Sequence, residues 1–220
     1  MKKLIALVMA LAIIASFAAC GSKEEETETT TVPTTEQVVE DTTGEEAEEQ
    51  ITIGSAVLEA PEITDTTAAV DILDYIWMAM GAEHQPASYG GHFSEEYTGG
   101  PATYDLTYAE DLAATLLLPE DRMDAVTDAA TVVHMLNANT MTAGLVRLQE
   151  GADVEGFAQA VADRIMNNRW MCGFPEKMVI TQINEQYLFI AYGAAEMLNP
   201  MANGMGASWT ANELYNQPLE

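Results

Sequence analysis

A long acidic stretch confines the fold of this chain to its C-terminal part. Residues 21–65 carry fourteen acidic side chains and one base, Lys23, and threonine fills much of the remainder. Such a segment has little apolar surface to bury, and its like charges repel one another. We therefore expect an extended, disordered spacer. Residues 66–220 are enough for one domain with a core, but not for two.

The N-terminus before the spacer has the parts of a secretory signal in their usual order. Lys2 and Lys3 precede an uncharged apolar run over residues 4–19. That run is shorter than the ~20 residues that a membrane-spanning helix needs. Small residues stand just before Cys20, and this resembles the lipobox of bacterial lipoproteins. A spanning anchor and an ordinary cleaved signal are the alternatives.

The lipobox resemblance implies lipidation of Cys20 and a map of the chain. Cleavage before Cys20 exposes its amine, and two acyl chains on the sulfur-linked glycerol anchor stably where one chain does not. The map has four parts: a signal peptide over 1–19, a lipidated cysteine and acidic tether over 20–65, a single domain over 66–206, and a loosely packed tail over 207–220.

The charge of the domain excludes some partners. Residues 66–220 hold twenty-one acids against five bases. Nucleic acid is excluded, because its phosphates need clustered Lys and Arg. The same charge opposes a folded part that lies flat on anionic lipid. A cationic partner or weak divalent-ion binding is compatible with it, although a solvated acidic surface is the simpler interpretation.

The apolar spacing over residues 66–220 predicts an α+β fold. N-terminal helices precede a β-β-α-β-β-α unit, an order that favours one antiparallel sheet with its helices on one face. The residues at 81–102 show no period and are expected to form a long loop. The expected elements are a helix over 67–80, a helix ending at Pro119, strands over 131–136 and 145–149, a helix over 153–168, strands over 177–183 and 186–192, and a short helix over 194–199.

The second half of the domain resembles a known group of proteins. The residues that carry the resemblance are 133–140, Arg147-Leu148, and above all Asn168-Arg169-Trp170-Met171-Cys172-Gly173-Phe174-Pro175-Glu176-Lys177. With the lipobox, they resemble small uncharacterised lipoproteins of Gram-positive bacteria and, more distantly, a domain of unknown function found in such lipoproteins. The resemblance implies a Gram-positive cell surface and an α+β fold. It assigns no catalytic residue.

The long loop contains histidines and acids, which are residue types that can bind a metal ion. His84 and His92 lie near Glu83, Glu95 and Glu96, and such side chains can bind a transition metal. Their spacing matches no standard motif, so we expect polar loop residues.

A methionine row at the C-terminal end is the other candidate ligand set. Met197, Met201 and Met205 recur at i, i+4 and i+8, and thioethers in a row on a helix can hold Cu(I). Pro200 and Gly204 oppose a continuous helix, and methionine commonly fills cores. We therefore expect no metal site and no cofactor.

Candidate nucleophiles lack the partners that catalysis needs. Ser55 and Ser208 lie near glycines, but neither stands in G-x-S-x-G. Cys172 has no histidine at an interpretable spacing, and His134 is expected to be a satisfied core residue. No P-loop, G-x-G-x-x-G or C-x-x-C is present. We therefore expect no catalytic residue.

Cys172 loses its only possible disulfide partner once Cys20 carries lipid. We expect it to be a small buried residue beside Trp170 and Phe174. An exposed reactive thiol or an intermolecular bridge is the alternative.

The bases of the domain allow two interpretations. Arg147, Arg164, Arg169 and Lys177 are four of its five bases. Arg164 and Arg169 complement the C-terminal end of a helix dipole in one interpretation. In the other, all four line a patch over 147–177 that recognises an acidic ligand or wall polymer.

These observations predict a non-catalytic binding or structural lipoprotein. We expect it on the extracytoplasmic face of the cell membrane, held by lipid on Cys20, with the loop at 81–102 and the sheet face as its contact surface. Its partner would be a surface protein, a peptide or a wall ligand. A hydrolase of cell wall or peptides with an unfamiliar site, and a metal-binding lipoprotein, are the alternatives.

Overall fold

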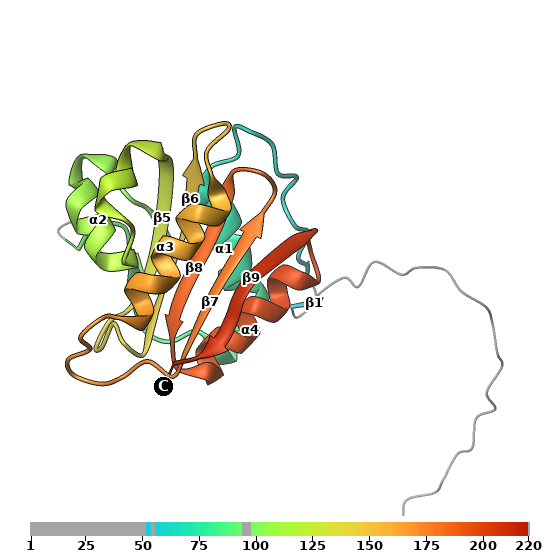
Figure 1. Cartoon of the computed structure of the whole chain (residues 1–220). Helices are drawn as coiled ribbons and strands as arrows, with labels where there is room; N and C mark the ends of the chain where they lie inside the picture. The colour runs from blue at the N-terminus through green and yellow to red at the C-terminus, as the bar shows by residue number, and fades with distance from the viewer. Residues whose placement is uncertain (1–51, 54–55, 94–97, 220) are drawn as a thin grey trace, which may run out of the picture. The chain divides into compact units, whose positions relative to one another are not determined.

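Two long hairpins form the centre of an antiparallel sheet in the computed structural model, which describes residues 52–53, 56–93 and 98–219 (Figure 1). The first pairs β5 (Val126–His134) with β6 (Met141–Leu148). The second pairs β7 (Lys177–Ile183) with β8 (Tyr187–Gly193). Asn184, at the tip of the second hairpin, has φ +58, as a tight turn requires. This hairpin confirms the strands expected over 177–183 and 186–192.

The sheet contains seven strands, all paired antiparallel, and the fold is α+β as expected. The order is β3-β5-β6-β8-β7-β9, and β4 also pairs with β5. The edge strands are β3 (Ser88–Gly90), β4 (Ala102–Thr103) and β9 (Ala211–Pro218). A separate short pair joins β1 (Thr52–Ile53) to β2 (Ala56–Val57).

Four α-helices and three 3₁₀ turns connect these strands in the described residues. The helix expected over 153–168 is confirmed, and Asp153 caps its start by accepting a hydrogen bond from the Gly156 N–H at 2.9 Å. The elements are α1 (Ala69–Ala79), α2 (Ala109–Leu116), α3 (Val154–Met166), α4 (Ala195–Gly206), η1 (Ala82–His84), η2 (Leu106–Tyr108) and η3 (Glu120–Ala125).

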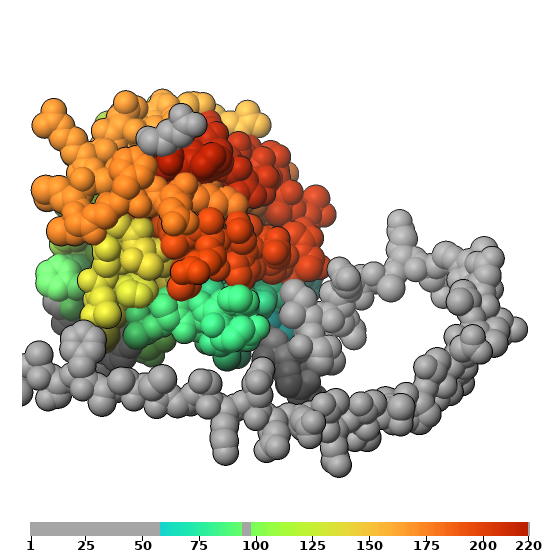
Figure 2. Space-filling model, turned by 90° about the horizontal axis from the view of Figure 1, so that it is seen from below, coloured from blue at the N-terminus to red at the C-terminus, as the bar shows by residue number. Residues whose placement is uncertain are grey.

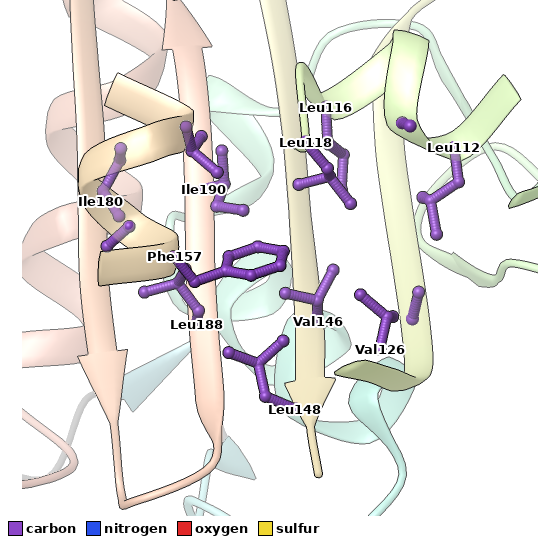
Figure 3. Close-up of a cluster of buried hydrophobic side chains, with 14 of the residues drawn as sticks. Leu112, Leu116, Leu118, Val126, Val146, Leu148, Phe157, Ile180, Leu188 and Ile190 are labelled. Carbon is purple, nitrogen blue, oxygen red and sulfur yellow. The ribbon is translucent and has the colours of Figure 1, made fainter. Parts of the chain in front are cut away.

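Helices cover both faces of the sheet, so the expectation of helices on one face was wrong. α2 and α3 lie over one face and α1 and α4 over the other (Figure 1). The side chains of β8 alternate between the two cores: Leu188 and Ile190 face α2 and α3, whereas Tyr187 and Phe189 face α1 and α4. Every residue of β8 is buried, which requires a cover on each side. Figure 3 shows the first core, where Phe157 of α3 packs against the sheet.

The C-terminal segment expected to be a loosely packed tail forms an edge strand. β9 pairs with β7 from Ile183↔Ala211 to Lys177↔Pro218. Its side chains are half-buried or exposed, so the local sequence carries no strong strand pattern. The open edge of β7 supplies the hydrogen bonds that hold it.

The folded domain also begins earlier than residue 66. The Tyr187 hydroxyl donates to the Thr64 carbonyl at 3.0 Å, and the Trp209 indole donates to the Pro61 carbonyl at 3.1 Å. Ile63 packs against the α1 and α4 core. The last residues of the expected tether therefore belong to the domain. Residues 1–51, which include the expected signal peptide and Cys20, lie outside the described residues.

α4 continues through Pro200, where the expected helix ended. Met201, Met205 and Leu198 are fully buried against α1 and the sheet. Their burial compensates for the hydrogen bond that a proline inside a helix removes.

Tyr192 provides a test of the α2 and α3 core. Its hydroxyl donates to the Thr115 carbonyl at 2.8 Å, and burial raises the pKa of the Tyr192 phenol above its ordinary value of 10.0. The folded state therefore keeps this proton where the unfolded state loses it. Its contribution to stability is complete below pH 10 and is lost as the pH rises through the folded pKa.

We expect Tyr192→Phe to lower the free energy of unfolding by about 1 kcal/mol at neutral pH, because one buried hydrogen bond is lost. The variant should also lose stability less steeply than the wild type above pH 10. Burial also raises the pKa of Tyr187, so part of the alkaline loss should remain. Urea unfolding at several pH values measures both effects, and equal slopes for variant and wild type would contradict the assignment.

Candidate functional site

Exposed apolar side chains gather at the end of the sheet where the β5–β6 turn meets the loop between α3 and β7. We call this surface, residues 135–140 and 168–176, the apolar loop end. Figure 2 looks at the domain from this side, with the orange loop beside the yellow turn. The exposed fractions are 48% for Met135, 86% for Leu136, 80% for Met171 and 54% for Phe174. Large apolar residues at such exposure on adjacent loops are typical of a contact surface.

Two asparagine side chains tie the loops of the apolar loop end together. The Asn139 amide donates to the carbonyls of Met171 at 2.6 Å and Gly173 at 2.8 Å. The Asn137 amide donates to the Cys172 carbonyl at 2.9 Å. Three bonds thus join segments more than thirty residues apart in the chain. The two loops that carry the exposed side chains are therefore fixed to one another by hydrogen bonds.

Both loops are also ordered from within. The His134 Nδ1 atom accepts the N–H groups of Leu136 and Asn137, each at 3.2 Å. His134 is half-buried, so it caps a turn and is not the core histidine that we expected. In the other loop, Cys172 has φ +63, a left-handed conformation that is uncommon for a residue with a side chain.

Cys172 is exposed, so the expectation of a small buried residue was wrong. Its neighbours Trp170 and Phe174 contact one another instead, with ring centroids 6.3 Å apart in an edge arrangement. Trp170 also packs on Tyr192 at 5.0 Å. The indole Nε1 of Trp170 is buried and has no acceptor among the described residues.

The apolar loop end stands out in charge as well. Among residues 135–140 and 168–176, Glu176 is the one acid, whereas residues 66–220 hold twenty-one. Arg169 is exposed within it. The carboxylate of Glu176 accepts a hydrogen bond from the Ala195 N–H at 2.9 Å, at the start of α4. The two loops thus carry one base and one acid, in a domain with twenty-one acids and five bases.

The Asn139 contacts predict a local effect. We expect Asn139→Ala to lower the free energy of unfolding by about 1–2 kcal/mol, because two partly exposed hydrogen bonds are lost. The loop around Arg169 should open more often, and trypsin should cleave there faster. Asn199→Ala, which removes a surface asparagine bonded to Lys177, is the matched control. Equal cleavage rates for wild type and Asn139→Ala would show that the asparagine does not hold the loop.

An open groove of about 1050 Å³ lies at the opposite end of the sheet, beside the β7–β8 turn. Asp65, Glu150 and Glu185 contribute carboxylates to its lining, and Trp209 and Ile63 contribute apolar surface. The residues that line it include no base. Such a lining suits a cationic ligand.

The candidate ligands His84 and His92 have different surroundings. The His84 Nε2 atom lies 3.8 Å from Glu83 on the surface of η1. His92 is buried, stacks on Tyr108 with centroids 3.9 Å apart, and lies 3.3 Å from an Asp111 carboxylate oxygen. His92 is thus a packed residue and not the polar loop residue that we expected.

Neither a metal cluster nor a nucleophile with a base is found among the described residues. They contain no group of three His, Cys, Asp or Glu side chains arranged to hold a metal ion. Glu95, Glu96 and Ser55 lie outside them. The Ser208 hydroxyl donates to the Gly204 carbonyl at 2.9 Å and lies 2.5 Å from the Tyr75 hydroxyl, so it helps α4 to contact α1.

The four bases over 147–177 do not form one patch. Arg147 donates to the Asp65 carbonyl at the groove end of the sheet. Arg164 pairs with Glu120 at 3.0 Å in the last turn of α3, and Lys177 bonds to Asn199. Arg169 alone is exposed in the apolar loop end. The helix-dipole interpretation therefore fits Arg164, whereas Arg169 lies beyond the end of α3.

The sheet faces and the stretch 81–102, which we expected to form the contact surface, are largely folded into the domain. The sheet faces are covered on both sides. Much of the stretch 81–102 is folded: it contains η1, and β3 and β4 pair with β5. The apolar loop end was missed because exposed apolar residues look like core residues in a sequence. The low number of acids in residues 135–140 and 168–176, where Glu176 is the one acid, is the sequence feature that distinguishes it.

Comparisons of the chain with protein-family models, with curated proteins and with solved structures found no match. Within the part of the chain that the structure describes, no helix has the length and apolar character needed to cross a membrane.

Proposed function

We propose that the protein is a lipid-anchored binding module on the extracytoplasmic face of the cell membrane, and that the apolar loop end is its contact surface. Lipid on Cys20 supplies the anchor and the acidic tether supplies reach. The observation that carries the proposal is the apolar loop end itself. It presents Leu136, Met171 and Phe174 on two loops joined by side-chain hydrogen bonds, in a domain that is otherwise strongly acidic.

Three features favour binding over catalysis. The exposed side chains of the loop end are apolar and have no reactive group apart from the Cys172 thiol. The interloop hydrogen bonds hold the surface in one arrangement, which lowers the entropy lost on binding. No observation in the described residues favours the hydrolase or the metal-binding alternative.

Photocrosslinking in intact cells tests the proposal. A photoreactive amino acid at position 136 or 171 should form crosslinked products, whereas the same group at position 78 should form fewer. Met78 is a suitable control because it is also an exposed apolar residue, at 41%, but lies on α1. Equal crosslinking from all three positions would refute a special role for the loop end.

The groove supports a second candidate function, which is the capture of a cationic ligand. Its carboxylates attract positive charge, and the Trp209 ring can contribute a cation–π contact. An arginine-rich peptide should then bind the protein, and the Glu150→Gln, Glu185→Gln pair should weaken that binding without unfolding the domain. Binding that is unchanged in this variant would exclude the groove.

A further inference from the structure

We propose that the apolar loop end docks into the interface of the lipid bilayer and holds the domain upright on the membrane that anchors it. Leu136, Met171 and Phe174 enter the boundary between headgroups and acyl chains. Arg169 faces the headgroup phosphates. This inference rests on the proposed function, because it names the partner of the surface assigned above.

The chemistry of the loop end fits this interface. Apolar side chains of peripheral proteins enter the headgroup and acyl boundary to a depth of roughly 5–10 Å. Loops that project from a domain reach this depth without burying the rest of it, and Met171 and Leu136 are the most exposed large apolar residues of the two loops. A long basic side chain such as Arg169 extends to the phosphate level while its stem stays in the apolar layer.

Charge selects which end of the domain faces the membrane. The anionic surface of a bacterial leaflet repels carboxylates within a Debye length. The two loops of this end carry one acid, Glu176, whose carboxylate accepts the Ala195 N–H, so turning this end toward the lipid brings fewer carboxylates to the phosphates than turning the groove end would. The groove end, with Asp65, Glu150 and Glu185, then points away from the membrane. The acidic charge that opposes a flat orientation thus favours an upright one.

A second copy of the chain fits the loop end less well than lipid does. Stable protein interfaces use roughly 20–30 residues on each side. The loop end offers four exposed large apolar side chains on two short loops. A fluid bilayer needs no matching surface, so a few projecting side chains suffice for it.

The lipid anchor raises the occupancy of a weak contact between the loop end and the bilayer. Between Cys20 and the first described residue, Thr52, lie thirty-two peptide steps, which span up to ~110 Å when fully extended. The tether can therefore bring either end of the domain to the bilayer. It also keeps the loop end at a local concentration of the order of millimolar, at which weak docking is populated.

Cys172 allows a direct test, because it is an exposed thiol in the middle of the loop end and Cys20 is the only other cysteine. The lipoprotein is labelled at Cys172 with the fluorophore NBD and reconstituted into vesicles of phosphatidylcholine and phosphatidylglycerol. We expect blue-shifted emission, quenching by nitroxide lipids and protection from aqueous iodide. The control carries the label at the groove end, in a Glu150→Cys, Cys172→Ser variant, and should remain exposed to iodide.

A second measurement does not depend on the anchor. Residues 20–220 with Cys20→Ser keep every residue that the structure describes, and vesicle titration of this NBD-labelled chain gives a partition coefficient. Leu136→Asp and Met171→Asp should each lower it by at least roughly tenfold, because each removes an apolar side chain that enters the bilayer and adds a charge. Phe93→Asp, at an apolar residue that is 75% exposed outside the loop end, should leave it unchanged.

The possible outcomes separate the inference from the proposed function. A Cys172 label that stays open to iodide in anchored protein overturns docking, as does a partition coefficient that Leu136→Asp leaves unchanged. Concentration-dependent association without lipid overturns it in favour of a second copy. Cellular crosslinks from position 136 to a protein, with no vesicle binding, overturn docking while the binding function stands. A reactive thiol at Cys20 refutes the anchor, and the unanchored titration still decides docking.

Discussion

Replacing Phe157 with alanine is expected to lower the free energy of unfolding by about 3–5 kcal/mol. Phe157 lies on α3 with 2% of its surface exposed, in the core that α2 and α3 form on the sheet. Its ring packs near Leu188 and Val146 (Figure 3). The strands below cannot move to fill the space, because β6 and β8 are paired along their length. Domains of this size are stable by about 5–15 kcal/mol, so this change removes a large part of the total.

Phe174→Ala is the matched control for this prediction. Phe174 is 54% exposed in the apolar loop end, so its removal should lower the free energy of unfolding by less than about 1 kcal/mol. It should instead lower the crosslinking yield from position 136. Urea unfolding compares the two variants directly. If Phe174→Ala destabilised the domain as much as Phe157→Ala, the loop end would be part of the core and not a contact surface.

The elements that the sequence predicts well are those with one clear period. The helix over 153–168 follows from one apolar stripe, and the β7–β8 hairpin follows from two apolar runs around Asn184. The burial of the sheet on both faces could also have been predicted from the sequence. β8 is an unbroken apolar run from Tyr187 to Tyr192, and such a run is typical of a strand that is covered on both faces.

Other elements depend on contacts that no local pattern carries. β9 is largely polar and is held by the free edge of β7, so its existence depends on a partner strand that lies 28 to 41 residues earlier in the chain. α4 passes Pro200 because its apolar side chains fit the core beneath it. In both, tertiary contacts override the intrinsic preference of the segment.

Only parts of the candidate site could be predicted from the sequence. Asn137 and Asn139 lie in the turn between β5 and β6. Their bonds to the carbonyls of residues 171–173 join distant segments, so sequence spacing cannot reveal them. Leu136 and Met171 resemble core residues by type, and only the folded chain shows that they are exposed.

Replacing Cys20 with serine is expected to move nearly all of the protein from the membrane fraction to the soluble fraction or the medium. A serine hydroxyl does not form the thioether that carries the diacylglyceryl group. A single acyl chain binds membranes with a constant of only about 10⁴ M⁻¹, and the variant would have none. Fractionation followed by mass measurement of the N-terminal peptide distinguishes loss of lipid from a block in cleavage. Lipid-free wild-type protein would refute the anchor.

Cys172→Ser is the internal control for that experiment, because it removes the only other cysteine and leaves the predicted lipid site intact. This variant should stay in the membrane fraction. The Cys20→Ser protein also separates the two contacts that we propose with the bilayer. Once the lipid is absent and the signal peptide has been cleaved, the membrane association that remains should come from the loop end, and Leu136→Asp should abolish it. Association that persists in the Cys20→Ser, Leu136→Asp double variant would require a contact that neither the lipid nor the loop end provides.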